Sequence, residues 1–236
     1  VAVGIALDPV PVREIAGALV VLAAGAALVV SIARRRAGVA GERVDDARRS
    51  ARVAAMTGIE REAQARVEDV AEFPPLLDLL APAFGVIGLV AGALDAADAR
   101  PVVALLRILV GAAFLGALTD AMLLGHWYLV QPGLARGSLL ELVRWTADIW
   151  FVEVVALLLP TGMISVFDGS IDDGYNGILG WTWATCAITT IGLCYVTRAA
   201  LREKQYAAVM AATGLLYLAI LTGFGTDLIA RAVLAS

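Results

Sequence analysis

The sequence has very few residues of the types that hold metals, haem or disulfides. Among 236 residues there are two cysteines, Cys186 and Cys194, and one histidine, His126. On a helix the two cysteines would lie about 12 Å apart along the axis, which is too far for a disulfide. No CxxC or CxxCH pattern occurs, which excludes covalent c-type haem and cysteine-held iron–sulfur clusters. One histidine cannot supply both axial ligands of a bis-histidine haem, so haem is disfavoured and no metal site is expected.

The usual sequence motifs of nucleotide-binding, nucleic-acid-binding and common catalytic proteins are also absent from the sequence. The sequence contains no Walker motif, no Rossmann glycine pattern and no HExxH, GxSxG or kinase motif. Lys204 is the single lysine, and the net charge is -4. A nucleic-acid-binding chain would instead need a basic face. These absences assign no catalytic residue and favour a non-catalytic subunit over a self-sufficient enzyme.

Long apolar runs dominate what is present. The chain is 60% hydrophobic and 17% charged, with mean hydropathy +0.83, and the charge lies mostly between the runs. Each run is long enough, at about 1.5 Å per residue, to cross a hydrocarbon core of about 30 Å. The sequence therefore predicts an all-α polytopic membrane protein, a bundle of about six transmembrane helices. The six runs are 14–33, 76–97, 101–130, 138–167, 177–200 and 206–234.

One polar segment interrupts this pattern and divides the chain. We expect residues 1–13 to precede transmembrane helix 1 at 14–33, with a five-helix bundle over 76–236. Between them, 34–75 is an arginine-rich arm of high helix propensity that ends at Pro74 and Pro75. Two interpretations of the arm stay open: a helical hairpin anchored on the membrane surface, or a docking arm for a soluble partner.

The charges of the connections alternate along the chain. The connections after the first, third and fifth runs are basic, whereas those after the second and fourth are mostly acidic. Lys and Arg concentrate on the cytoplasmic side of bacterial membranes. The sequence thus predicts a multi-pass protein of the bacterial inner membrane with both termini extracytoplasmic and a cytoplasmic arm. The basic residues are Arg34, Arg35, Arg36, Arg43, Arg48, Arg49, Arg52, Arg61, Arg66, Arg136, Arg198, Arg202 and Lys204.

Ionisable side chains inside the third and fourth runs are the candidate site. Each costs about 2.5–3.5 kcal/mol to insert, so each needs a partner or a function. Counted from the turn at 131–137, Asp120 and Asp148 fall at similar depth, as do His126 and Arg144. Aromatic residues flank them, and Glu153 lies deeper in the fourth run. The candidates for a quinone or proton site are Asp120, His126, Trp127, Tyr128, Arg144, Trp145, Asp148 and Glu153.

Functional and structural interpretations of these residues compete. A quinone carbonyl needs a donor such as His or Tyr, a carboxylate can relay its proton, and aromatic rings can stack on it. Alternatively, Trp127 and Tyr128 belong to the aromatic belt with His126 beside them at the interface. Arg144 and Asp148 are four residues apart and can simply pair along one helix face. Glu153 is expected to be protonated or paired with a donor on another span.

Three further features are structural expectations. Pro160 and Gly162 should kink the outer part of the fourth run. Asp227 and Arg231, four residues apart, should pair on the last helix. The segment 168–177 superficially resembles a calcium loop, but its twelfth position is Leu179 rather than Glu, so a solvated turn is expected.

These observations predict an integral subunit of a larger, respiratory or otherwise redox-linked, bacterial membrane complex. Quinone is the one cofactor that the polar cluster favours, and other membrane subunits and the lipid bilayer are the expected partners. A small-solute or proton/ion transporter is the first alternative, resting on the intramembrane carboxyls and Pro160. A structural or assembly subunit, in which every polar residue has an internal partner, is the second.

Overall fold

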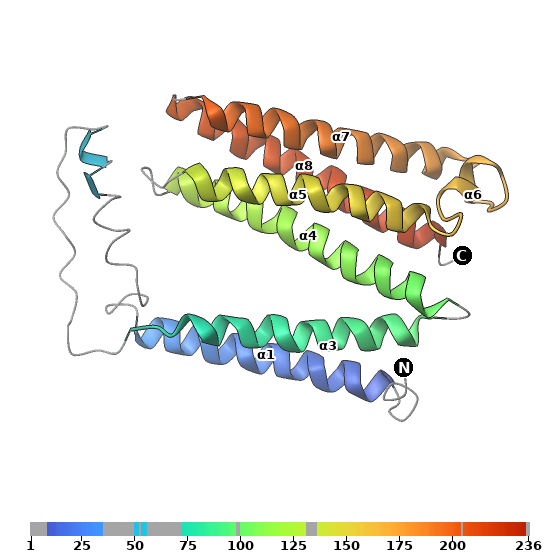
Figure 1. The fold of residues 1–236 in the computed structure, drawn as a ribbon, viewed down its shortest axis with the longest axis horizontal. Coiled ribbons are helices and arrows are strands. Elements are labelled where there is room, and N and C mark those ends of the chain that lie inside the picture. Colours follow the sequence, from blue (N-terminus) through green and yellow to red (C-terminus); the bar gives the residue numbers. More distant parts are fainter. Residues whose placement is uncertain are drawn as a thin grey trace. The chain divides into compact units, whose positions relative to one another are not determined.

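In the computed structural model the regular elements are helices (Figure 1). The structure describes residues 9–34, 50–51, 53–55, 72–97, 100–130, 136–203 and 205–234. Within these ranges each long apolar run of the sequence forms a helix over most of its length. The elements are α1 (Pro9–Ala33), η1 (Pro75–Leu79), α3 (Leu80–Asp95), α4 (Pro101–Val130), α5 (Arg136–Leu158), α6 (Ile164–Phe167), α7 (Ile178–Arg202) and α8 (Tyr206–Leu234).

The helices form two compact units, Val1–Leu105 and Leu106–Ser236. In the first unit α1 and α3 pack together as a hairpin, although the sequence analysis grouped α3 with the later helices. Glycine allows the close approach, since a Cβ on Gly88 would lie only 3.3 Å from the Cβ of Ala16. Small residues at such crossings let helix backbones pack closely in lipid.

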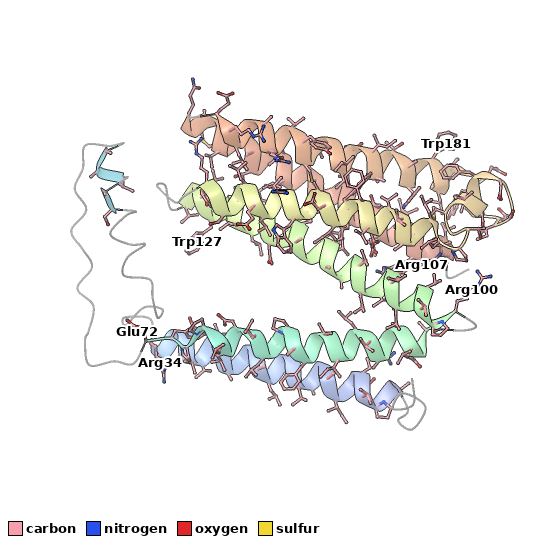
Figure 2. The ribbon with its side chains drawn as sticks, viewed as in Figure 1. Arg34, Glu72, Arg100, Arg107, Trp127 and Trp181 are labelled. Atoms are coloured by element: carbon pink, nitrogen blue, oxygen red, sulfur yellow. The ribbon has the colours of Figure 1, made fainter. Side chains whose placement is uncertain are left out.

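Polar contacts fasten both ends of this hairpin. At one end Arg13 Nη1 lies 2.8 Å from Asp95 Oδ2. At the other end Arg34 Nη1 donates to the backbone carbonyl of Glu72 at 2.9 Å, and Figure 2 shows these two residues side by side. The predicted arm 34–75 starts and ends here. Its interior, apart from 50–51 and 53–55, lies outside the described residues, as do residues 1–8 of the predicted N-terminal segment.

The second unit is a bundle of α4, α5, α7 and α8 with the short α6 at one end (Figure 1). One core cluster contains Leu139 of α5, Leu201 of α7 and Val209 of α8. A second cluster contains Leu157 of α5 and Val233 of α8, beside the short α6. Since Leu139 and Leu157 lie near opposite ends of α5, this helix runs the length of the bundle.

Five helical segments of the described chain are long and apolar enough to span a membrane. They correspond to α1, η1 with α3, α4, α7 and α8, which confirms an all-α polytopic membrane protein. The expected fourth span is not among them. Its helix, α5, is 23 residues long but carries Glu141, Arg144, Asp148 and Glu153, which lower its mean hydropathy.

The fourth run also ends as a helix earlier than its apolar sequence suggests. We expected a kink at Pro160, but α5 stops at Leu158 and only the four-residue α6 follows. Proline has no N–H for the helical ladder. Gly162 has φ +39°, and a Cβ there would collide with the carbonyl oxygen of Leu157. The helix therefore ends at Leu158 instead of continuing to residue 167.

Candidate functional site

Four of the predicted site residues lie on the exterior of the second unit. Asp120 and His126 of α4 are exposed, and so are Arg144 and Asp148 of α5. Arg144 Nε lies 3.7 Å from Asp148 Oδ2, so these two side chains do pair along one face of α5, as their spacing allows. No hydrogen bond or ion pair within the described chain joins Asp120 or His126 to that pair.

His126 has a partner that the sequence analysis did not name. Its Nδ1 lies 3.1 Å from the hydroxyl oxygen of Tyr217, which comes from α8. The two rings meet edge to face, with centroids 6.3 Å apart and an interplanar angle of 87°. Both side chains are exposed, so this hydrogen-bonded pair is a polar group on the exterior of the second unit.

The aromatic candidates divide between the surface and the core. Trp127 and Trp145 are 50% and 58% exposed, and Figure 2 shows Trp127 projecting outward from α4. Tyr128 is 4% exposed and belongs to the core cluster that contains Leu139 and Leu201. Only the two tryptophans therefore lie where an aromatic belt or a ligand at the surface could use them.

Glu153 lies in a different place from the other candidates, in the interior of the bundle. Its side chain is completely buried. The carboxyl of Asp227, which is 2% exposed and lies on α8, is nearby, since both carboxyls lie within 3.4 Å of the place of a Cβ on Gly111. Tyr217 and Asp227 are ten residues apart on α8, or about 15 Å along its axis. Glu153 and the His126–Tyr217 pair are therefore separate sites.

Arg231 completes the buried cluster from the next turn of α8. Its Nε donates to Asp227 Oδ2 at 2.7 Å, which confirms the expected i,i+4 pair. Its Nη2 donates to the backbone carbonyl of Arg107 on α4 at 3.1 Å. The Arg231 side chain is 36% exposed against 3% for Asp227, so the cation lies at the edge of the cluster and the carboxyl inside it.

Gly111 of α4 makes the room that this cluster occupies. A Cβ at this position would lie 2.8 Å from Asp227 Oδ1 and 3.4 Å from Glu153 Oε1, and would also collide with Arg231 Nη2. The residue is buried within α4. Glycine is therefore required here, because any side chain would displace the charged groups of α5 and α8.

Arg107 lies one turn before Gly111 on α4, and it donates hydrogen bonds to backbone carbonyls at the end of α5. Its Nε donates to the carbonyl of Ala156 at 3.2 Å, and its Nη2 donates to the carbonyl of Leu159. The last carbonyls of a helix have no intrahelical donor, and a positive charge there offsets the helix dipole. Figure 2 shows Arg107 at the end of the second unit away from Trp127.

The loop 168–177 uses its acidic residues to organise backbone. Asp173 Oδ1 accepts from the N–H groups of Tyr175 and Gly177, and Oδ2 accepts from that of Leu179, each at 2.9 Å. These donors, that of Gly177 foremost, hold the pKa of Asp173 below its usual value. Asp168 Oδ1 accepts from the N–H of Ser170, and hydrogen bonds with Ser170 also lower the pKa of Asp168. The described residues contain no group of three or more His, Cys, Asp or Glu side chains placed to hold a metal ion.

The spacing in the sequence paired Asp227 with Arg231 and singled out Glu153, but it did not bring Glu153 to that pair. Arg107 lies near the start of α4, whereas Glu153 and Asp227 lie near the ends of α5 and α8. Because α4 runs opposite to α5 and α8, these positions fall in the same half of the bundle. The spacing of residues within one helix does not show which helix faces meet. It therefore gave no signal for the contact of Glu153 with Asp227 or for that of His126 with Tyr217.

Comparison with protein-family models, with curated proteins and with solved structures finds no match for this chain. The class of protein therefore follows from the fold alone, which is that of an all-α multi-pass membrane protein. Any more specific function has to be argued from the two polar sites.

Proposed function

We propose that this chain is an integral subunit of a larger, redox-linked bacterial membrane complex, with a quinone- or proton-handling site beside His126. The observation that carries the proposal is the hydrogen-bonded pair of His126 and Tyr217, which is exposed on the exterior of the second unit. Lipid tails offer such groups no hydrogen bonds, so a polar ligand or another protein is needed to cover them.

The pair has the chemistry that a quinone carbonyl requires. When the Tyr217 hydroxyl donates to Nδ1 of a neutral imidazole, the proton of that ring is on Nε2. That N–H is then a donor for a carbonyl oxygen, and the exposed Trp127, the next residue on α4, provides an indole ring at the same level of the helix. Reducing a quinone to a quinol takes two electrons and two protons. We infer that another subunit supplies the electrons, since this sequence has no motif for a redox centre.

The other exterior charges support the same proposal. Asp120 and the Arg144–Asp148 pair are exposed on helices that traverse the unit. Burying them against a partner subunit would remove the cost of facing lipid, and Asp120 would be a proton donor within that interface. A transporter is the second candidate, and the buried carboxyl of Glu153 is the observation that favours it.

We also propose a location in the inner membrane with both termini extracytoplasmic. The orientation rests on the arginine-rich connections and requires that α5 crosses the membrane. Two facts support that crossing: α5 extends from one core cluster to the other, and its 23 residues would span about 35 Å. Labelling of an introduced Ala2→Cys by an impermeant thiol reagent, in a variant without Cys186 and Cys194, tests it. Labelling only after lysis of the cells would contradict the orientation.

The decisive experiment is gentle extraction of the native protein, followed by identification of co-migrating subunits and of bound quinone. We expect redox subunits and quinone in the parent. In His126→Gln and Tyr217→Phe the complex should stay intact but bind quinone about five-fold more weakly, since one hydrogen bond contributes about 1 kcal/mol. Leu123→Ala, an exposed change one turn earlier on α4, is the matched control and should bind quinone normally. A solitary chain without quinone would sink the proposal.

A further inference from the structure

The buried cluster of the second unit leaves three carboxyl oxygens without a donor. Within the described residues, neither carboxyl oxygen of Glu153 accepts a hydrogen bond, and Oδ1 of Asp227 accepts none either. The nearby arginines direct donors elsewhere: Arg231 to Asp227 Oδ2 and a backbone carbonyl, and Arg107 to the end of α5. A fully ionised Glu153 would thus be a buried carboxylate with no donor, which is strongly unfavourable.

We propose that Glu153 and Asp227 bind one proton between them and so form an internal proton-binding site. A carboxylic acid on Glu153 can donate its O–H to Asp227 Oδ1. That single proton satisfies an oxygen of each residue, and Asp227 Oδ2 keeps its hydrogen bond from Arg231. The two carboxyls are close enough to interact directly, and both meet beside Gly111.

The charges around the pair favour one proton rather than none or two. With one proton, the remaining carboxylate is neutralised by Arg231. The charge of Arg107 is opposed by the carbonyls of Ala156 and Leu159 at the negative end of α5. The fourth helix, α7, has charged side chains only at Arg198 and Arg202, in its last turns at the far end. A second proton would leave Arg231 without a counter-ion.

The site does not depend on the proposed quinone function. It lies about 15 Å along α8 from the His126–Tyr217 pair and uses different residues of α4 and α8. Arg231 is the member of the cluster that reaches the exterior, with 36% of its side chain exposed, whereas the carboxyls are enclosed. The ligand class is a single proton, held by a carboxyl pair and balanced by a guanidinium.

The test is infrared spectroscopy of the purified full-length protein at neutral pH. A protonated carboxylic acid has a carbonyl stretch that is separate from the carboxylate bands and shifts in D₂O. We expect difference spectra of the parent against Glu153→Gln, and of the parent against Asp227→Asn, to show one such acid per chain. Asp148→Asn removes an exposed carboxyl and is the matched control, whose difference spectrum should lack the buried acid band.

Three outcomes would overturn the inference. In the first outcome, the difference spectrum of the parent against Glu153→Gln shows no carboxylic-acid band, which would mean that both carboxyls are ionised in the parent. The band could persist in Asp227→Asn, which would show that Glu153 holds its proton without sharing it. The third outcome applies if a variant fails to fold, and it uses the pH titration of the band in the parent and in Gly111→Ala. A shared proton requires the two titrations to differ, so identical titrations would overturn the inference.

Discussion

Substitution of Gly111 by alanine tests the packing of the buried charges without changing any ionisable group. The added Cβ would lie 2.8 Å from Asp227 Oδ1 and 3.4 Å from Glu153 Oε1, and it would collide with Arg231. At least one of these charged side chains has to move. Adding a methyl group to a well-packed interior typically costs about 1–3 kcal/mol of unfolding free energy.

Gly116 provides the matched control on the same helix. It is exposed, and a Cβ there would meet nothing within 4 Å. Gly116→Ala should therefore be neutral, or more stable by up to about 1 kcal/mol through helix propensity. Taken together, the two variants should differ by about 1–4 kcal/mol in free energy of unfolding.

The assay is denaturant-induced unfolding of parent and variants in one detergent, followed by tryptophan fluorescence. Equal slopes against denaturant would show that the midpoints report stability and not a change in the exposed surface. The reasoning fails if Gly111→Ala unfolds at the same midpoint as Gly116→Ala, because the cluster would then not occupy the space beside Gly111.

Two further predictions concern single hydrogen-bonding side chains. Thr213→Val removes the hydroxyl that donates to the carbonyl of Gly125 on α4 at 3.0 Å, and should lower the unfolding free energy by about 0.5–1 kcal/mol. Thr182→Val, whose hydroxyl bonds only within its own helix, should leave the midpoint near that of the parent. Asp173→Asn weakens three backbone hydrogen bonds at the start of α7 and should lower the melting temperature at neutral pH. The pKa of Asp173 is lowered in the folded state, so its contribution is complete above about pH 4 and disappears as the pH falls through the folded pKa. Melting curves at pH 7 and pH 3 check this, and a difference as large at pH 3 as at pH 7 would contradict it.

The apolar runs predicted most of the fold, because a helix is the simplest structure that satisfies its own backbone in lipid. The end of α5 shows where this reasoning stops. Residues 159–167 are as apolar as a span, yet Pro160 removes a donor and Gly162 takes a positive φ. Hydropathy averages over such local constraints, so the run was predicted to continue to residue 167.

The site was predicted in parts. Helical spacing correctly paired Arg144 with Asp148 and Asp227 with Arg231. Spacing within one helix cannot show which face of that helix meets its neighbours. The contact of Glu153 with Asp227 and that of His126 with Tyr217 depend on how α4, α5 and α8 rotate against each other. Those rotations depend on the packing of side chains such as Phe114 and Leu118 along whole helix faces.

The hydrogen bond from Arg34 to the carbonyl of Glu72 has a consequence for how this chain tolerates change. The polypeptide leaves the α1–α3 hairpin and returns to it at a single place, so the two ends of the intervening segment lie together. Lengthening or shortening that segment alters the entropic cost of closing it only slightly, since this cost grows with the logarithm of its length. The segment can therefore acquire, lose or exchange sequence over evolution while both membrane helices stay in register.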